Sequence, residues 1–181
     1  MTVPIGRRAL AGGGLLAACL PLRLRAQPAR PVRIGVLTDL AGPYADAGGP
    51  GSLLAAQMAV RDFGGTVLGL PVEVLAADTR NKPDVAGAIA RQWYDDGVDA
   101  VTDLPVTPIA AAVQQAAREK SRTVMIAAAT ANELTTKTCA PVSTMWIDDN
   151  HALVSAATRA AGANLGKTWF FITVTTPSAT R

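Results

Sequence analysis

The chain has 181 residues, of which 49% are hydrophobic and 17% charged, so it is not an intrinsically disordered protein and it suits one domain or part of a larger one. Four of its 17 basic residues and no acidic residue lie in residues 1–26, which leaves 13 basic against 14 acidic residues in the remainder. A body that is nearly neutral gives no electrostatic reason to expect a nucleic-acid partner.

Residues 1–26 have the order of an export signal. Paired arginines precede the apolar stretch Ala9–Leu22, which is too short to span a bilayer, and Ala26 offers a small residue for cleavage. The paired arginines also suit the twin-arginine route. A Leu-Ala-Ala-Cys run that ends at Cys19 resembles a bacterial lipobox, which would lipidate Cys19 and anchor the protein. Cleavage at Ala26 and anchoring through Cys19 remain two alternatives, and both predict a periplasmic location.

The segment that follows predicts a buried strand, a long loop and a helix. The apolar run Val32–Leu37 is typical of a strand in a parallel sheet, and the loop Asp39–Gly51 contains two glycine-proline turn signals. One face of the next helix is expected to carry Leu53, Ala56, Val60 and Phe63. Because open α/β sheets bind ligands where a strand leads into a loop and a helix, we predict that Asp39–Gly51 forms half of a small-molecule site.

Strands and helices are predicted to alternate along the rest of the chain. The expected strands are Leu70–Ala77, Val98–Leu104, Thr123–Ala129, Ser143–Asp148 and Lys167–Val174. The expected helices are Pro83–Tyr94, Thr107–Lys120 and His151–Ala163. The first is expected to carry Val85, Ile89 and Trp93 on one apolar face, and the second to direct Ile109, Val113 and Ala117 inward. This alternation predicts an α/β fold with right-handed crossovers and a parallel sheet that has helices on both faces.

Catalytic signals are missing from the sequence. It has no Gly-x-Ser-x-Gly elbow, no metal-ligand cluster and no phosphate-binding loop with lysine, so we predict neither an enzyme nor a cofactor. His151 is expected at the start of a surface helix, Cys139 as a small apolar filler, and Trp93 and Tyr94 in the core. Asp78 is expected in a solvated, charged loop.

Three strand ends are predicted to direct loops toward one edge of the sheet. The candidate ligand contacts in these loops are the ring of Tyr44, the hydroxyls of Thr107 and Thr130, and the small residues Ala128 and Ala129, which let a ligand approach the backbone. The helix that begins near Pro108 directs free N–H groups and its positive dipole end to the same edge, which suits a carboxylate. Thr107 is also a candidate N-cap, and the two roles are compatible.

Four segments of the chain carry a resemblance to a known family. IGVLTDLAGPYADAGG, ADTRNKPDVAGAIARQWYDDGVDAV, AAVQQAAREKS and ANELTTKTCAP together resemble the periplasmic substrate-binding proteins of branched-chain amino-acid-type ABC transporters, including the leucine-binding protein. The similarity runs from about Val32 to Ile172. It implies the type I periplasmic-binding fold, in which two α/β lobes close on a small amino acid or organic carboxylate without catalysis. It also implies an inner-membrane ABC permease as partner, a first lobe over residues 27–148 and a second lobe from residue 149.

The resemblance also implies positions for the ligand contacts. Members of the family bind an amino acid's carboxylate through backbone N–H groups and hydroxyls in the loops after the third and fourth strands. Those loops correspond here to Pro105–Thr107 and Ala128–Thr130, and Tyr44 stands where the family often has an aromatic residue. Leu104–Thr107 departs from the serine-rich loop of amino-acid binders, which argues against a leucine-like ligand. The alternative function is a ligand-sensing module of the same fold that feeds a receptor.

The last eight residues depart from the family. Relatives are roughly twice as long and continue the final strand with Asp-Tyr-Ala-Phe-Gly-His-Ala, whereas Val174–Arg181 reads VTTPSATR. Loss of one base from GC-rich codons for the family's continuation yields these eight residues, so we hypothesise a one-base frameshift. Residues 149–181 would then hold only the first helix and strand of the second lobe, and apolar sheet edges and helix faces would stay uncovered. An authentic stop codon without second-lobe sequence in the next frame would rule this out.

Overall fold

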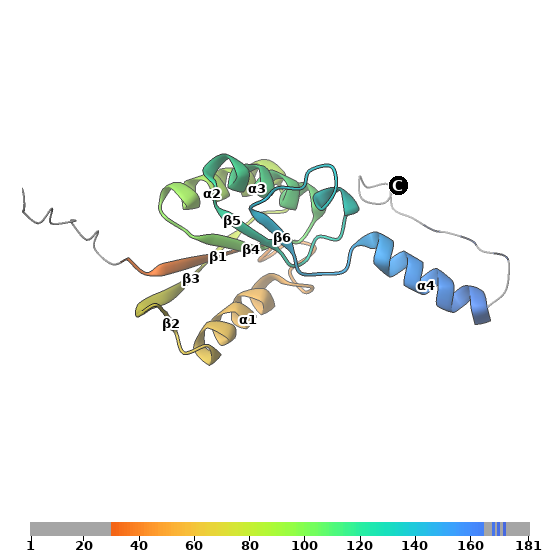
Figure 1. The fold of residues 1–181 in the computed structure, drawn as a ribbon, viewed down its shortest axis with the longest axis horizontal. Helices are drawn as coiled ribbons and strands as arrows, with labels where there is room; N and C mark the ends of the chain where they lie inside the picture. The colour runs from red at the N-terminus through yellow and green to blue at the C-terminus, as the bar shows by residue number, and fades with distance from the viewer. Residues whose placement is uncertain (1–29, 165–167, 169, 171, 173–181) are drawn as a thin grey trace, which may run out of the picture.

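The computed structural model describes residues 30–164, 168, 170 and 172, which form an α/β fold (Figure 1). Its strands are β1 (Val32–Thr38), β2 (Thr66–Val67), β3 (Leu70–Asp78), β4 (Ala100–Asp103), β5 (Thr123–Ile126) and β6 (Ser143–Met145). Its helices are α1 (Gly49–Asp62), α2 (Pro83–Asp95), α3 (Thr107–Lys120) and α4 (Asn150–Asn164), with a 3-10 turn η1 (Asn132–Leu134). Of the predicted strand Lys167–Val174 only residues 168, 170 and 172 are described, none of them as part of a strand, and the rest of this segment and residues 175–181 lie outside the described part of the chain.

The sheet has the strand order β2-β3-β1-β4-β5-β6, and every pairing except β2 with β3 is parallel. Helices α2 and α3 cover one face and α1 lies on the other, whereas α4 extends away from the sheet (Figure 1). The predicted α/β fold, with a parallel sheet between helices, is therefore confirmed. The short strand β2 was not predicted, and Leu68 and Gly69 form its two-residue turn to β3 with φ of 51° and 78°. Positive φ at both positions is typical of a type I′ hairpin.

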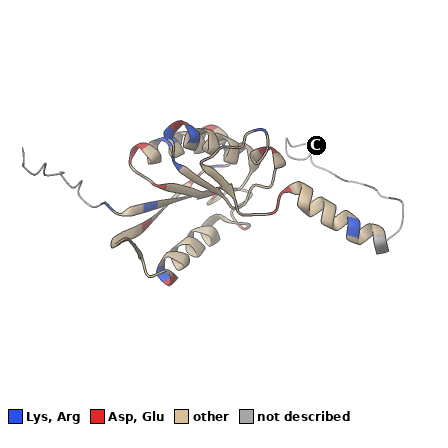
Figure 2. Ribbon diagram, viewed as in Figure 1, with Lys and Arg blue, Asp and Glu red and all other residues tan. Residues whose placement is uncertain are grey.

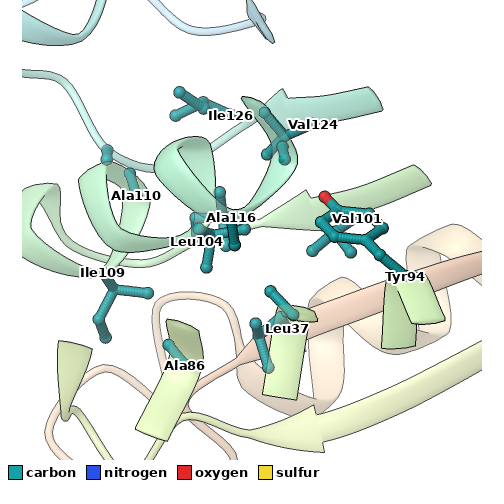
Figure 3. Close-up of a cluster of buried hydrophobic side chains, with 14 of the residues drawn as sticks. Leu37, Ala86, Tyr94, Val101, Leu104, Ile109, Ala110, Ala116, Val124 and Ile126 are labelled. Carbon is teal, nitrogen blue, oxygen red and sulfur yellow. The ribbon is translucent and has the colours of Figure 1, made fainter. Parts of the chain in front are cut away.

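The buried core lies between the sheet and the α2–α3 layer (Figure 3). Its members include Leu37, Ala86, Ala90, Tyr94, Val101, Leu104, Ile109, Ala110, Val113, Ala116, Val124 and Ile126. The face predicted for α3 is confirmed, but α2 buries Ala86 and Ala90 and leaves Ile89 half-buried. Small residues let α2 approach α3 closely, since a Cβ placed on Gly87 would lie 3.6 Å from the Cβ of Ala112.

Helix α1 covers the opposite face only in part. Gly49 is its one buried residue among those described, and Phe63, predicted to face inward, is 72% exposed. Phe63 follows the last helical residue as the C-cap, so its spacing from Val60 does not place it on the inner face. A groove of about 390 Å³ remains between α1 and the sheet. Its lining includes Ser52, Ala56 and Val60 of α1 and Val36, Thr102 and Met125 of the sheet.

The burial of individual residues can be compared with the other structural predictions. Tyr94 is 3% exposed and Trp93 packs against the core, as predicted, and His151 is exposed in the first turn of α4. Cys139 is exposed, so its predicted place as an apolar filler is wrong, because it lies in the polar loop after η1. The predicted strand Thr123–Ala129 ends at Ile126, where the ladder to β6 also stops.

Charged residues of both signs are interspersed over the outer surfaces of α2 and α3, and α4 is nearly uncharged (Figure 2). Two ion pairs join α2 to α3 on this surface, Arg91 with Glu119 at 2.9 Å and Lys120 with Asp95 at 2.6 Å. Among the described residues, none of the helices has the length and apolar character needed to cross a membrane.

Candidate ligand-binding site

The candidate site is the edge of the sheet at which the parallel strands end. Strand β1 pairs with β3 on one side and with β4 on the other, in the parallel sense. The chain therefore crosses in one direction from β1 to β3 and in the other from β3 to β4, which makes the gap between β1 and β4 a topological switch point. Open α/β sheets bind ligands at such points, outside the carboxyl ends of the strands. The loops after β1, β4 and β5 all begin at this edge.

Asp39 organises the loop after β1. Its side chain is fully buried, its Oδ1 accepts the backbone N–H of Gly42 at 2.9 Å, and its Oδ2 accepts that of Tyr44 at 2.9 Å. A Cβ on Gly42 would lie 2.5 Å from Oδ1 of Asp39, so this turn requires glycine. The two bonds hold the backbone of Tyr44 in place, while Tyr44 as a whole remains 39% exposed. The sequence placed Asp39 in the site but did not predict this role, although aspartate side chains commonly accept hydrogen bonds from nearby backbone groups in turns.

The loop after β4 has an unusual backbone. Asp103 and Leu104 have φ of 82° and 69°, in the left-handed region that non-glycine residues rarely adopt. Two backbone hydrogen bonds hold the turn, from Leu104 N–H to the carbonyl of Leu37 at 3.2 Å and from Ala127 N–H to the carbonyl of Asp103 at 3.0 Å. These bonds tie the end of β4 to β1 and β5, and strain of this kind persists only where the surrounding structure fixes it.

Thr107 is the first residue of α3, so its predicted place as the N-cap is wrong. Val106 holds the N-cap position with an extended backbone, and Pro108 follows Thr107 in the first turn. Proline is tolerated at either of the first two helical positions, and the Thr-Pro pair therefore does not fix the boundary. No side chain of the described residues caps α3, so its first turn still presents a positive dipole end at this edge. Pro105 and Thr107 are both half-buried.

The loop after β5 combines a buried and a polar part. Ala129 is 2% exposed, so its side chain belongs to the core and only its backbone is available, whereas Ala128 and Thr130 are half-buried. Gln114 of α3, 2% exposed, holds this region by donating from Nε2 to the carbonyl of Leu134 at 3.0 Å and to Oγ of Ser143 at 2.8 Å. Sequence analysis did not predict this role, and its only signal is a glutamine on a largely apolar helix.

Asp103 directs its carboxylate toward the α1 groove. The residue is 5% exposed, and its Oδ2 has no hydrogen-bond partner among the described residues. A Cβ on Gly48 would lie 3.5 Å from this oxygen and 3.1 Å from Oγ of Ser52, which places the carboxylate beside the start of α1. The positive end of the α1 dipole partly offsets the cost of burying this charge.

The topology brings the three predicted loops to one edge, with Tyr44 after β1, Pro105 and Thr107 after β4, and Ala128–Thr130 after β5. None of these residues lines the α1 groove. The groove reaches the same edge at Asp103, the last residue of β4, and at Ala127, which follows β5, so the two surfaces are neighbours with different lining residues.

The parallel sheet, the switch point and the alternating helices agree with a type I periplasmic-binding fold. The sequence profile of the periplasmic binding protein family matches residues 31–181. The chain belongs to this family, which confirms the resemblance in the sequence, and the match extends beyond Ile172. The family consists of substrate-binding proteins rather than enzymes and implies an extracytoplasmic location. None of the curated proteins matches the chain.

Solved structures agree with this assignment. A periplasmic binding protein from Burkholderia mallei is 40% identical with a TM-score of 0.73, over 78% of this chain and 38% of that one. A branched-chain amino acid ABC transporter periplasmic ligand-binding protein from Burkholderia xenovorans is 38% identical with a TM-score of 0.71, over 73% and 36%. A solute-binding protein from Rhodopseudomonas palustris in complex with 3,4-dihydroxybenzoic acid has the same fold at 20% identity, with a TM-score of 0.65 over 74% and 37%. The chain thus spans well under half the length of these proteins.

Proposed function

We propose that the chain provides the first-lobe half of a periplasmic solute-binding site that captures a small amino acid or organic carboxylate for an ABC importer. The observation that carries the proposal is the switch point between β1 and β4, where three loops and an uncapped helix begin at one edge of the sheet. The first turn of α3 and the hydroxyl of Thr107 supply donors and a positive dipole end for a carboxylate. An inner-membrane permease would receive the ligand.

The ligand class follows from the donors at this edge. Backbone N–H groups and hydroxyls bind a carboxylate without a charged partner, and the small residues beside Thr130 leave room for its approach. Leucine and 3,4-dihydroxybenzoate are suitable probes, because related proteins are a branched-chain amino acid transporter component and a dihydroxybenzoate complex, and both probes carry a carboxylate. The departure of Leu104–Thr107 from a serine-rich loop favours the benzoate over leucine.

Titration calorimetry of the chain with each probe at millimolar concentration tests the proposal. Replacing Thr107 with valine removes one hydrogen bond to a charged group, so the affinity is expected to fall about ten- to a hundredfold. Thr66→Val is the matched control, because exposed Thr66 lies in β2 beside the amino end of β3 and should leave the affinity unchanged. Absence of binding to both probes, or equal affinity in the Thr107→Val variant, would contradict the proposal.

A further inference from the structure

The first turn of α4 is attached to the loop after β5. The N–H of Asn150 donates to the carbonyl of Thr130 at 2.8 Å, and the N–H of His151 donates to Oδ1 of Asn132 at 3.2 Å. The N–H of Ala152 donates to Oδ1 of Asp149 at 2.8 Å. N–H groups in the first turn have no acceptor within their own helix. Three such groups are satisfied here, and two of the three acceptors belong to the loop after β5.

Hydrogen bonds hold the backbone around Asn132 in place. Its carbonyl accepts the N–H of Thr136 at 3.1 Å and the hydroxyl of the same residue at 2.8 Å, which closes the turn that follows η1. Gln114 holds the carbonyl of Leu134, the last residue of η1, from the side of α3. The backbone of Asn132 is therefore tied to the α2–α3 layer, while its side chain reaches outward to α4.

Helix α4 leaves much of its apolar surface exposed. Leu153 and Val154 are 47% and 57% exposed, and the helix extends away from the sheet (Figure 1). Its buried apolar contact with the sheet is thus small, and polar contacts at the first turn carry more weight. These contacts are made to the loop that contains Thr130.

We propose that Asn132 is a positioning residue that links the candidate ligand loop, Ala128–Thr130, to the first turn of α4, so that the loop is held in place while α4 occupies this position. The proposal rests on the proposed function for the identity of this loop as a ligand contact. Movement of α4 away from the sheet breaks the bonds of Asn150 and His151, which releases the carbonyl of Thr130. A ligand that holds the Thr130 loop therefore also restrains α4, and this coupling is reciprocal.

Amide hydrogen exchange measured by NMR on the ligand-free chain tests the link. In Asn132→Ala, exchange is expected to accelerate about tenfold at His151, which loses its acceptor, and at Asn150, whose N–H donates to the carbonyl of Thr130. A tenfold change corresponds to the loss of about one hydrogen bond. Asp149→Ala is the matched control, because it removes an acceptor from the same turn of α4 without touching the loop. It should accelerate exchange at Ala152 and leave exchange at Asn150 unchanged.

Two further variants separate positioning from general stability. Asn132→Asp keeps the acceptor oxygen and adds a negative charge at a helix N-terminus, so it should restore slow exchange at His151 and Asn150. Asn132→Gln displaces the oxygen by one methylene and should behave like Asn132→Ala, which keeps the test decisive if the alanine variant does not fold. Unchanged exchange at Asn150 in both disrupting variants would overturn the proposal, because Asn132 would then cap α4 without fixing the loop to it.

Measuring ligand affinity in the same variants distinguishes this proposal from the proposed function. Where 3,4-dihydroxybenzoate binds the chain, its affinity should fall in Asn132→Ala and return in Asn132→Asp. A chain that shows the expected exchange pattern but binds no probe supports the link and contradicts only the proposed function.

Discussion

The two faces of the sheet differ in how completely they are covered. On one face, α2 and α3 bury residues such as Leu37, Ile109 and Val113 completely. On the other face, α1 leaves Leu54 57% exposed and Phe63 72% exposed, and a groove of about 390 Å³ separates it from the strands. Apolar patterning is present on both faces, so the pattern alone does not say which apolar residues become buried.

The difference assigns separate roles to the two faces. Because hydrophobic burial is the main favourable term in folding, the α2–α3 face should carry most of the stability of the described chain. That face also supports the loops after β4 and β5, through Leu104 and Gln114. The α1 face contributes the loop with Tyr44 and should tolerate substitution far better.

The largest effect is predicted for a leucine buried under the α2–α3 layer, compared with a leucine of α1 on the opposite face. Leu37→Ala creates a cavity in the buried core and should lower the free energy of unfolding by about 2–5 kcal/mol. Leu54→Ala removes an exposed side chain from α1 and should change it by no more than about 0.5 kcal/mol. Urea denaturation of both variants measures the two values. Equal losses would show that α1 is as important to the core as the opposite layer.

A pair of glycines gives the next largest effect. A Cβ on Gly35 would lie 2.4 and 2.5 Å from two ring carbons of Trp93, so Gly35→Ala must displace the indole and should cost about 1–3 kcal/mol. Gly51 in α1 has no atom within 4 Å of such a Cβ, and Gly51→Ala should stabilise by about 0.4–1 kcal/mol. Thermal unfolding of both variants tests this pair, and a shift of the same sign in both would contradict the comparison.

A smaller effect is expected from one hydrogen bond in the covered layer. Tyr94 donates its buried hydroxyl to the carbonyl of Thr123 at 3.2 Å, and burial raises the pKa of this phenol above its ordinary value. Tyr94→Phe should therefore cost about 0.5–1.5 kcal/mol while keeping the ring in place. A loss as large as that of Leu37→Ala would mean that the ring itself had moved, which a crystal structure of the variant would reveal.

The smallest effect concerns pH at the amino-terminal end of the strands. Arg30 donates a hydrogen bond to Asp99, which lowers the pKa of that carboxyl below its ordinary value. Because the pKa is lower in the folded state, this stabilisation is present above about pH 4 and is lost as the pH falls through the folded-state pKa. Unfolding of wild type and Asp99→Asn between pH 6 and pH 2 should show a slightly weaker acid dependence in the variant. Identical profiles would show that Asp99 does not contribute to the acid dependence of unfolding.

The sequence predicted most elements because their periodicity is strong. The apolar run of β1 and the inward spacing of Ile109 and Val113 in α3 are confirmed. Strand β2 was missed because two residues carry no periodic signal, and Leu68 gives no warning of the positive φ in its turn. The apolar face predicted for α2 lies one residue away from the face that the structure buries. The alanines that allow α2 to approach α3 closely are only weakly hydrophobic, so the sequence pattern did not mark them as buried.

The candidate site was predictable in position but not in detail. Alternating strands and helices imply that loops meet at one edge, and the structure has Tyr44 and Thr130 in loops at that edge and Thr107 in the first turn of α3. The hydrogen bonds of Asp39 to its own loop and of Asn132 to α4 depend on tertiary geometry, so side-chain identity alone does not reveal them.

Chemical-shift mapping is the measurement that tests the account most directly. With 3,4-dihydroxybenzoate added to the isotope-labelled chain, we expect the largest amide shifts at Thr107, Ile109 and Thr130, at the carboxyl edge of the sheet. The amides of Val60 and Met125, which line the α1 groove, should not move. Shifts that cluster in the groove and spare the edge would contradict the central claim that the ligand binds where β1, β4 and β5 end.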